Sequence, residues 1–161
     1  MRIGEIAVLG THANERRNFI ASVCAQLEMT TPHFAFGRLP INEQLTLHFY
    51  GLAVQPDDQT SSLDLLSRRM LGYIVLFPWQ DEPAFSQIKP CIDYLTTRHE
   101  AALVVAAHTP QARLLPSLAV LQEGIAVNNE GKLAFFEEDD PASAKRVLLS
   151  LIDLLIERAE V

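Results

Sequence analysis

The chain has 161 residues, of which 48% are hydrophobic and 20% charged, and these proportions are typical of one folded domain spanning residues 1–161. The formal net charge of −7 excludes a nonspecific nucleic-acid binder, because such proteins bind phosphates through clustered Lys and Arg. No apolar run reaches the roughly 18 residues that cross a bilayer, and the start, MRIGEIAVLG, lacks signal-peptide features, so we expect a cytoplasmic protein.

The first half of the chain alternates between strand and helix patterns. An apolar run at residues 6–9, closed by Gly10, predicts a buried parallel strand. Helical spacing then predicts a helix whose apolar face holds Phe19, Ile20, Val23, Cys24 and Leu27. Residues 33–39 and 45–50 alternate in polarity around an Asn42-Glu43-Gln44 turn, which predicts an antiparallel hairpin.

The second half repeats the alternation. Three more strands are predicted at residues 73–77, 103–107 and 133–136. Four helices are predicted over residues 63–70, 82–99, 114–121 and 141–155. Pro90 lies inside the second of these helices and is expected to kink or restart it. Asp140 and Pro141 suit the first turn of the last helix.

This order of elements predicts an α/β domain with a mostly parallel six-stranded sheet, one antiparallel edge hairpin and helices on both faces. Ligands of such sheets bind at the carboxyl ends of the strands. We therefore expect the loops at residues 10–17, 51–62, 78–82 and 108–113 to gather at one edge.

The segment from Gly10 to Arg17 has the layout of a phosphate-binding loop, G-x-x-x-x-G-K-[ST], but not its chemistry. Glu15 stands in place of the second glycine, where a carboxylate crowds and repels a polyphosphate. Arg16 replaces the lysine and keeps only its charge. Arg17 replaces the hydroxyl that ligates Mg²⁺, and a cation cannot ligate a cation.

Several longer stretches resemble the Ras-like small GTPases, in particular the bacterial branch typified by the mutual gliding protein A polarity GTPases. The resemblance spans residues 4–158 and is carried by the stretches TTPHFAFGRLPINEQLTLHFYGLAVQ, LLSRRMLGYIVLF, IKPCIDYLTTR, AALVVAAHTP and DPASAKRVLLSLIDLL. It implies a single-domain P-loop NTPase or Ras-like fold. It also implies GTP or GDP with Mg²⁺ as the family's ligand and a small Roadblock/LC7-type protein as a partner.

The family's functional positions are kept only in part. Thr30 and Thr31 match the first switch, and Gln55 matches the glutamine that positions water. At the other positions the chain departs from the family: Gly51 stands where the family has the aspartate that organises the metal, and Val54 where it has a glycine. His108, Thr109 and Gln111 replace residues of the guanine-reading N-K-x-D motif. The phosphate cradle, metal ligand and base reader are thus all altered together.

These departures favour a GTPase-like protein without catalysis, acting as an interaction or regulatory module with no bound cofactor. The alternative is a small GTPase that still binds nucleotide, with Arg16 replacing lysine. A third hypothesis is an enzyme that reuses the site for a small molecule or a phosphate ester.

For several of these residues, interpretations without a functional role also remain open. Arg16 and Arg17 can form an anion site, but solvated arginines are expected more often. His12 and His108 should share an edge of the sheet, with no Asp, Glu or Cys at ligand spacing to accompany them. A role for Trp79 as a lid or as part of a partner surface is as consistent with the sequence as packing on the next helix. The thiols Cys24 and Cys91 are expected to be buried, and the run 137–140 to act as a solvated helix cap.

Glu15 carries a more specific hypothesis. The run Glu15-Arg16-Arg17 lies where the loop meets the helix. We expect the Glu15 carboxylate to bond locally, either to the loop amides or to one of the two arginines, and so to occupy part of a phosphate's place.

Overall fold

The computed structural model describes residues 2–24, 27–31, 34–53, 68–79, 81–109, 131–137 and 140–159. Its strands are β1 (Arg2–Gly10), β2 (Met29–Thr31), β3 (Phe34–Pro40), β4 (Leu45–Ala53), β5 (Gly72–Pro78), β6 (Leu103–Thr109) and β7 (Gly131–Glu137). Its helices are α1 (Ala13–Cys24), α3 (Glu82–Arg98) and α5 (Pro141–Ala159). The predicted helix segments 63–67 and 114–121 lie outside the described residues.

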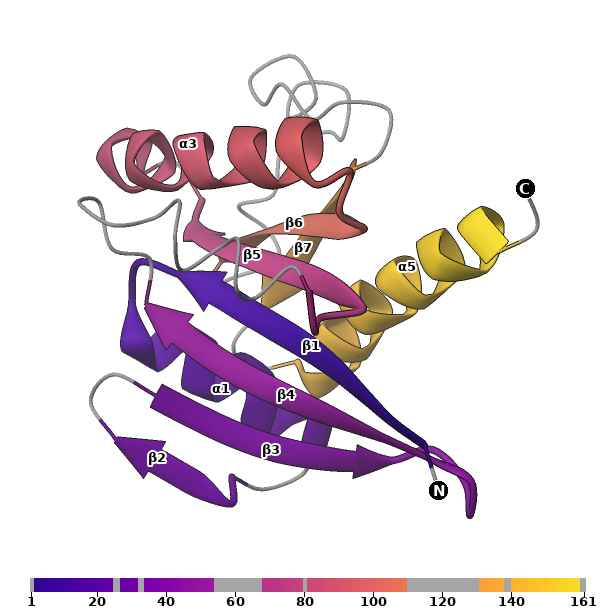
Figure 1. The fold of residues 1–161 in the computed structure, drawn as a ribbon. Coiled ribbons are helices and arrows are strands. Elements are labelled where there is room, and N and C mark those ends of the chain that lie inside the picture. Colours follow the sequence, from indigo (N-terminus) through magenta and orange to yellow (C-terminus); the bar gives the residue numbers. More distant parts are fainter. Residues whose placement is uncertain are drawn as a thin grey trace.

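All the strands join one sheet of order β2-β3-β4-β1-β5-β6-β7 (Figure 1). The pairs from β4 to β7 are parallel, while β3 pairs antiparallel with both β2 and β4. The α/β class, the mostly parallel sheet and the antiparallel hairpin are therefore confirmed. The predicted strand number of six is wrong, because the sheet has seven strands.

The strand missing from the prediction is β2. It is only three residues long and all three residues are exposed, so it has no apolar alternation that a sequence pattern could detect. It forms because its backbone pairs with β3, Met29 opposite Phe36 and Thr31 opposite Phe34.

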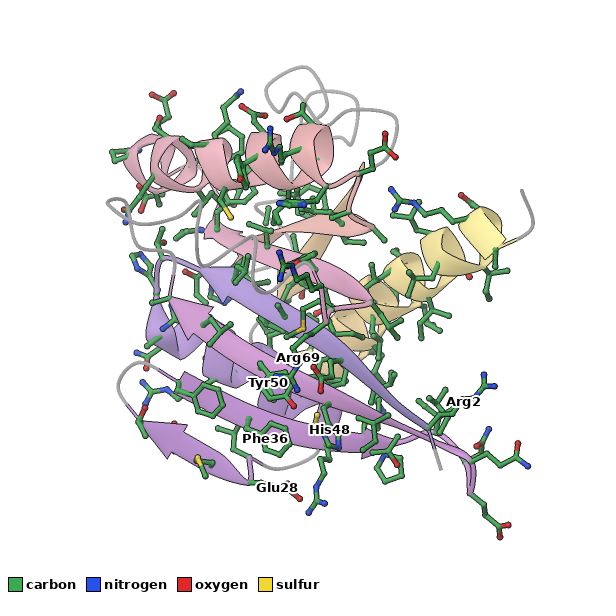
Figure 2. The ribbon with its side chains drawn as sticks, in the orientation of Figure 1. Arg2, Glu28, Phe36, His48, Tyr50 and Arg69 are labelled. Atoms are coloured by element: carbon green, nitrogen blue, oxygen red, sulfur yellow. The ribbon has the colours of Figure 1, made fainter. Side chains whose placement is uncertain are left out.

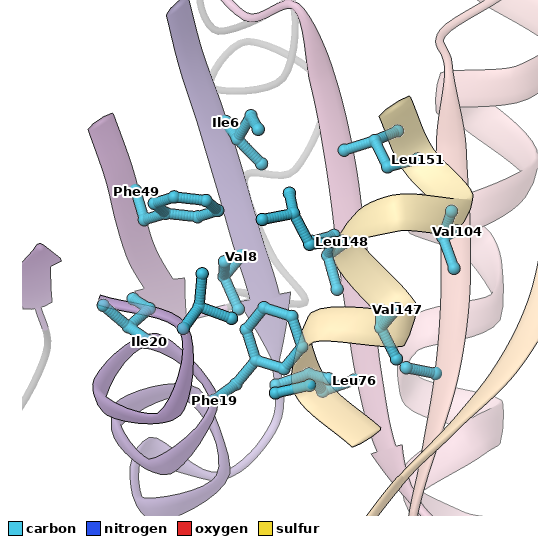
Figure 3. Packing of buried hydrophobic residues seen from close by; sticks show 14 of the residues in the cluster. Ile6, Val8, Phe19, Ile20, Phe49, Leu76, Val104, Val147, Leu148 and Leu151 are labelled. Carbon is cyan, nitrogen blue, oxygen red and sulfur yellow. The ribbon is translucent and has the colours of Figure 1, made fainter. Parts of the chain in front are cut away.

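Helices cover both faces of the sheet, as predicted. The helices α1 and α5 pack on one face and α3 on the other (Figure 1). The central strand β1 serves both faces, because Ile6 and Val8 point to the first and Ala7 and Leu9 to the second. Figure 3 shows the first of these clusters, which contains Phe19 and Ile20 of α1 and Val147 and Leu148 of α5.

The ends of the elements follow local hydrogen bonding. Asn42 makes the predicted turn, its side-chain Oδ1 accepting from the amides of Gln44 (2.7 Å) and Leu45 (2.9 Å). Asp140 caps α5 by accepting from the Ala142 amide (3.1 Å), as predicted.

Two predicted helix boundaries need correction. The helix α1 ends at Cys24, earlier than the predicted Leu27. The helix α3 runs as one element through Pro90, so the expected restart at Pro90 is not observed. Pro90 lies on the exposed side of α3.

Candidate functional site

The candidate site lies where β1 ends and α1 begins. From β1 the chain passes through α1 to the β3–β4 hairpin on one side of β1, whereas β5 pairs with β1 on the other side. The order of strands therefore changes direction between β1 and β5, which is where open α/β sheets bind ligands. Gly10, Glu15, Arg16 and His108 surround this position, and we call them the β1–α1 corner.

The connection between β1 and α1 is shorter than predicted. Only Thr11 and His12 separate the two elements, and α1 begins at Ala13. The Arg16 amide already donates to the carbonyl of His12, at 3.3 Å. The expected loop over residues 10–17 is therefore wrong. No glycine stands between Ala13 and Arg17 to open the backbone around a phosphate, so these residues form the first turn of the helix.

Arg16 is buried in the corner. Its side chain points back along α1, and Nη1 donates to the Gly10 carbonyl at 2.7 Å. The residue is only 4% exposed, so the expectation of a solvated arginine is wrong. Burial lowers the pKa of the Arg16 guanidinium, and the charge of Arg17 lowers it further, while the charge of Glu15 raises it. Arg16 stands at the position of the lysine that binds phosphates in the family that the chain resembles. Here its guanidinium is bonded to the Gly10 carbonyl instead.

Glu15 is also 4% exposed, and it faces the end of β6. Its Oε2 lies 3.3 Å from Nδ1 of His108. The local partners expected for Glu15 are therefore wrong, because its nearest ionisable group comes from β6 and not from the loop or the arginines. Glu15 thus accompanies His108 in space, although no Asp, Glu or Cys stands at ligand spacing from His108 in the sequence.

Polar atoms in this corner remain without hydrogen bonds. Among the described residues, neither oxygen of Glu15 has a hydrogen-bond partner of good geometry, nor has Nε2 of His108 or Oγ1 of Thr11. The His108 ring instead packs on Phe136, with centroids 5.3 Å apart, and Phe136 meets Phe19 edge-on. An apolar ring, itself backed by a second one, therefore packs against the His108 side of the Glu15–His108 contact.

A third feature of the corner is the close approach of α1 to β4. A Cβ atom at Gly51 would lie 3.0 Å from Cδ1 of Ile20 and 3.4 Å from Cβ of Arg16. Gly51 occupies the position that the resemblance assigns to a metal-organising aspartate. A side chain of that size has no room here unless α1 moves away from the sheet.

The remaining predicted residues lie elsewhere. Arg17 is half-buried on α1 and donates to Oδ1 of Asn14, while His12 is exposed. Thr31 belongs to β2, three strands from β1, a separation of about 14 Å by ordinary strand spacing. Val54, Gln55, Gln111 and the side chain of Thr109 lie outside the described residues, as do Glu138 and Asp139 of the acidic run.

Trp79 packs on the opposite face from the Glu15–His108 contact. Its ring meets Phe135 edge-on at 6.1 Å, and it joins the cluster beneath α3. The packing alternative is therefore the one observed for Trp79. Cys24 and Cys91 are buried as predicted, and burial raises the pKa of each thiol to about 12.

One surface of the β3–β4 hairpin was not predicted from the sequence as a candidate site. Phe34, Phe36, His48 and Tyr50 form an aromatic face on the side of the hairpin away from α1 (Figure 2). These rings are half-buried, and Phe36 lies 5.2 Å from both His48 and Tyr50. The sequence did contain a signal for this surface: the small residues Ala35, Gly37 and Gly51 on the opposite side of the hairpin. They indicate that α1 covers that side and leaves the aromatic side uncovered.

A pattern in α1 itself could have found the buried charges. Glu15 precedes Phe19 and Val23 at steps of four, and Arg16 precedes Ile20 and Cys24 in the same way. The apolar stripe of the helix therefore extends back through both charged residues. The sequence interpretation began the helix too late to use this spacing.

The described part of the chain contains no group of three or more His, Cys, Asp and Glu side chains arranged to hold a metal ion. It also contains no helix long and apolar enough to cross a membrane. A comparison with protein-family models found no match to the chain, and a comparison with curated proteins found none either.

Proposed function

We propose that this protein is a Ras-like, GTPase-shaped interaction or regulatory module that neither binds nucleotide tightly nor hydrolyses it. The order of its strands and helices supports the first half of the proposal, since it has the hairpin after the first helix and the parallel crossovers that the resemblance implies. The β1–α1 corner supports the second half.

The observation that carries the proposal is the occupation of this corner by its own side chains. Arg16 bonds the Gly10 carbonyl, and a buried Glu15 carboxylate lies between α1 and His108. A polyphosphate placed here meets a negative charge, and it finds a guanidinium that is already bonded. Losing several charged hydrogen bonds at about 2 kcal/mol each takes a nanomolar site toward millimolar.

A module without nucleotide acts through its surface. The aromatic face contributes to this interpretation, because aromatic side chains are enriched at protein interfaces. We include in the proposal a protein partner of the Roadblock/LC7 type that the resemblance implies.

The test is a titration of the purified protein with GTP, GDP and ATP in the presence of Mg²⁺. We expect no saturable binding at micromolar concentrations by calorimetry. We also expect no rise in melting temperature, whereas a ligand at a hundred times its dissociation constant adds about 2.7 kcal/mol of stability. A dissociation constant at or below about 1 μM would instead favour the nucleotide-binding alternative, with Arg16 in the role of the lysine.

A matched variant tests whether the side chains of the β1–α1 corner or its backbone prevent nucleotide binding. Glu15→Gly combined with Arg17→Thr and Gln111→Asp restores three family residues. We expect it to remain a poor GTP binder, because Gly51 is packed against α1 and the helix still begins early. Tight binding by this variant would mean that the side chains alone had blocked the site.

A further inference from the structure

The surface of α5 carries an apolar stripe that no described element covers. Leu149 and Ile156 are 55% and 51% exposed, and the half-buried Ile152 lies between them. The spacing of three and four residues places all three on one side of the helix. This stripe borders the face that packs on the sheet through Val147, Leu148, Leu151 and Leu154.

The stripe lies on a helix whose far end is held against the rest of the fold. At its far end α5 is tied to the turn before β6, because Arg158 donates to the carbonyls of Glu100 (2.5 Å) and Ala101 (3.2 Å). In Figure 1 the last turns of α5 reach out beyond the sheet, toward the C-terminus. A partner therefore meets a fixed, accessible helix and loses little conformational entropy in ordering it.

Charges beside the stripe change sign along the helix. Lys145 continues the line of the stripe at its first end, next to Arg146, which pairs with Asp140 at 3.4 Å. Glu157 follows the stripe at its other end, and Asp153 lies beside its middle. A second copy of α5 in the antiparallel direction brings the basic half of each helix opposite the acidic half of the other. A parallel copy would bring like charges together. The pattern is thus self-complementary about a two-fold axis, as a homodimer interface requires.

We propose that α5 is a homodimerisation helix, and that two copies of this chain pack antiparallel through Leu149, Ile152 and Ile156. The axis passes near Ile152. Lys145 of one copy then faces Glu157 of the partner subunit when the axis crosses at the level of Leu151, because each of the two residues lies six positions, or about 1.7 turns, from that level. The contact does not depend on the state of the β1–α1 corner, so the dimer forms whether or not nucleotide binds.

The strength of the dimer follows from its size. One helix face against another buries less than the roughly 1,200 Å² at the lower limit of stable complexes. We therefore expect a weak dimer, with a dissociation constant of tens to hundreds of micromolar.

The first experiment is sedimentation velocity of the full chain from about 10 μM to 1 mM. The expected result is a rise of the mean mass from 18.0 kDa toward twice that value. Leu149→Glu should abolish the rise. Met29→Glu is the matched control, because Met29 is equally exposed (56%) but lies on β2. A monomer at the highest concentration, or an equal effect of the two variants, overturns the proposal.

The second experiment tests the antiparallel direction. Lys145→Glu and Glu157→Lys each place like charges opposite one another at both ends of the interface, so each variant alone should dimerise at least tenfold more weakly. An equimolar mixture restores both pairs of opposite charge and should dimerise at least as well as the original chain. Circular dichroism melts confirm that each variant folds. A mixture no stronger than the separate variants overturns the antiparallel arrangement.

Discussion

At the scale of single residues, the most unusual feature is a pair of buried opposite charges next to each other in the chain. Glu15 and Arg16 are both almost fully removed from solvent, yet each has a different neighbour. Arg16 bonds a backbone carbonyl of β1, and Glu15 contacts an imidazole of β6. Burying a charge without a partner costs several kcal/mol. The hydrogen bond to Gly10 offsets part of this cost for Arg16, whereas Glu15 has only the close approach of His108. The corner therefore joins α1 to two strands.

The first prediction concerns the contact between Glu15 and His108. In a double-mutant cycle with Glu15→Gln and His108→Gln, we expect a coupling of about 1 kcal/mol in the free energy of unfolding, because the two side chains touch in a confined place. Urea denaturation measures each variant.

The control for this cycle is His12→Gln, which changes an exposed histidine at the same edge of the sheet. Combined with Glu15→Gln it should be additive to within about 0.3 kcal/mol. Equal coupling for the two histidines would show that the effect is general electrostatics rather than the contact.

The chemistry of the corner was only partly predictable. That Gly10 and His108 share an edge followed from the parallel strands, and the order of elements is enough to establish it. That Glu15 turns inward did not follow, because a charged residue at a helix start is ordinarily solvated. Burial depends on where α1 lies against the sheet, and that is a property of the packing.

At the scale of elements, the position of α1 is determined by small residues on the hairpin. A Cβ atom at Gly37 would lie 2.7 Å from Cγ2 of Ile20, and one at Gly51 would lie 3.0 Å from Cδ1 of the same side chain. These two glycines let the helix approach β3 and β4 closely. Larger residues would push α1 outward and separate Arg16 from the Gly10 carbonyl.

The second prediction tests this close approach. Gly51→Ala should destabilise the fold by about 1–3 kcal/mol, because the new methyl group overpacks against Ile20. Ile20→Val removes the Cδ1 atom that the methyl meets, at a cost of about 1 kcal/mol alone. The double variant should therefore be less destabilised than the sum of the two, as measured by thermal and urea unfolding.

Gly37→Ala is the control for this rescue. Its methyl group meets Cγ2 of Ile20, an atom that valine also carries. Ile20→Val should leave the cost of Gly37→Ala unchanged. Rescue of both alanine variants to the same extent would contradict the contacts described.

The same scale shows which elements a sequence can predict. The described helices were all predicted, because each carries a regular apolar stripe over three or more turns. The strand β2 was not predicted, because three exposed residues are too few to show a hydrophobic periodicity. The loop before α1 was extended too far because the phosphate-loop template was applied to a run without its glycine.

At the scale of the whole molecule, the sheet separates two apolar clusters, and the one beneath α3 contains two buried ionisable groups. Tyr73 and Cys91 are each about 1% exposed. Burial raises the pKa of Cys91 from 9.0 to about 12, and burial followed by the neighbouring Cys91 charge raises the pKa of Tyr73 from 10.0 to about 12. Both groups stay protonated in the folded protein well into alkaline solution.

The third prediction follows from the sign of these shifts. Because each pKa is higher in the folded state, the unfolded chain loses its protons first as the pH rises. The stabilising contribution is complete below pH 9 and is lost between about pH 9 and 12. The free energy of unfolding should fall by up to about 1.4 kcal/mol per pH unit for each group. Urea melts at intervals from pH 8 to pH 11 measure the slope.

Cys91→Ala serves as the comparison for this slope. It removes one of the two buried thiols and leaves Cys24, whose pKa burial also raises from 9.0 to about 12, so the alkaline decline should become shallower while still beginning near pH 9. An unchanged slope would mean that other groups cause the alkaline loss of stability.

The central place of β1 has a consequence for the protein's synthesis. This strand leaves the ribosome before every other described element, yet it lies between β4 and β5, and its Ile6 and Val8 share a cluster with Leu148 and Leu151 of α5. The nascent chain must therefore hold an apolar strand without its covering layer until α5 has been synthesised. At about 5–20 residues per second this interval lasts on the order of ten seconds. We expect chaperones that bind extended apolar segments to associate with the nascent chain at this stage. They should dissociate once α5 packs on the sheet and covers the strand.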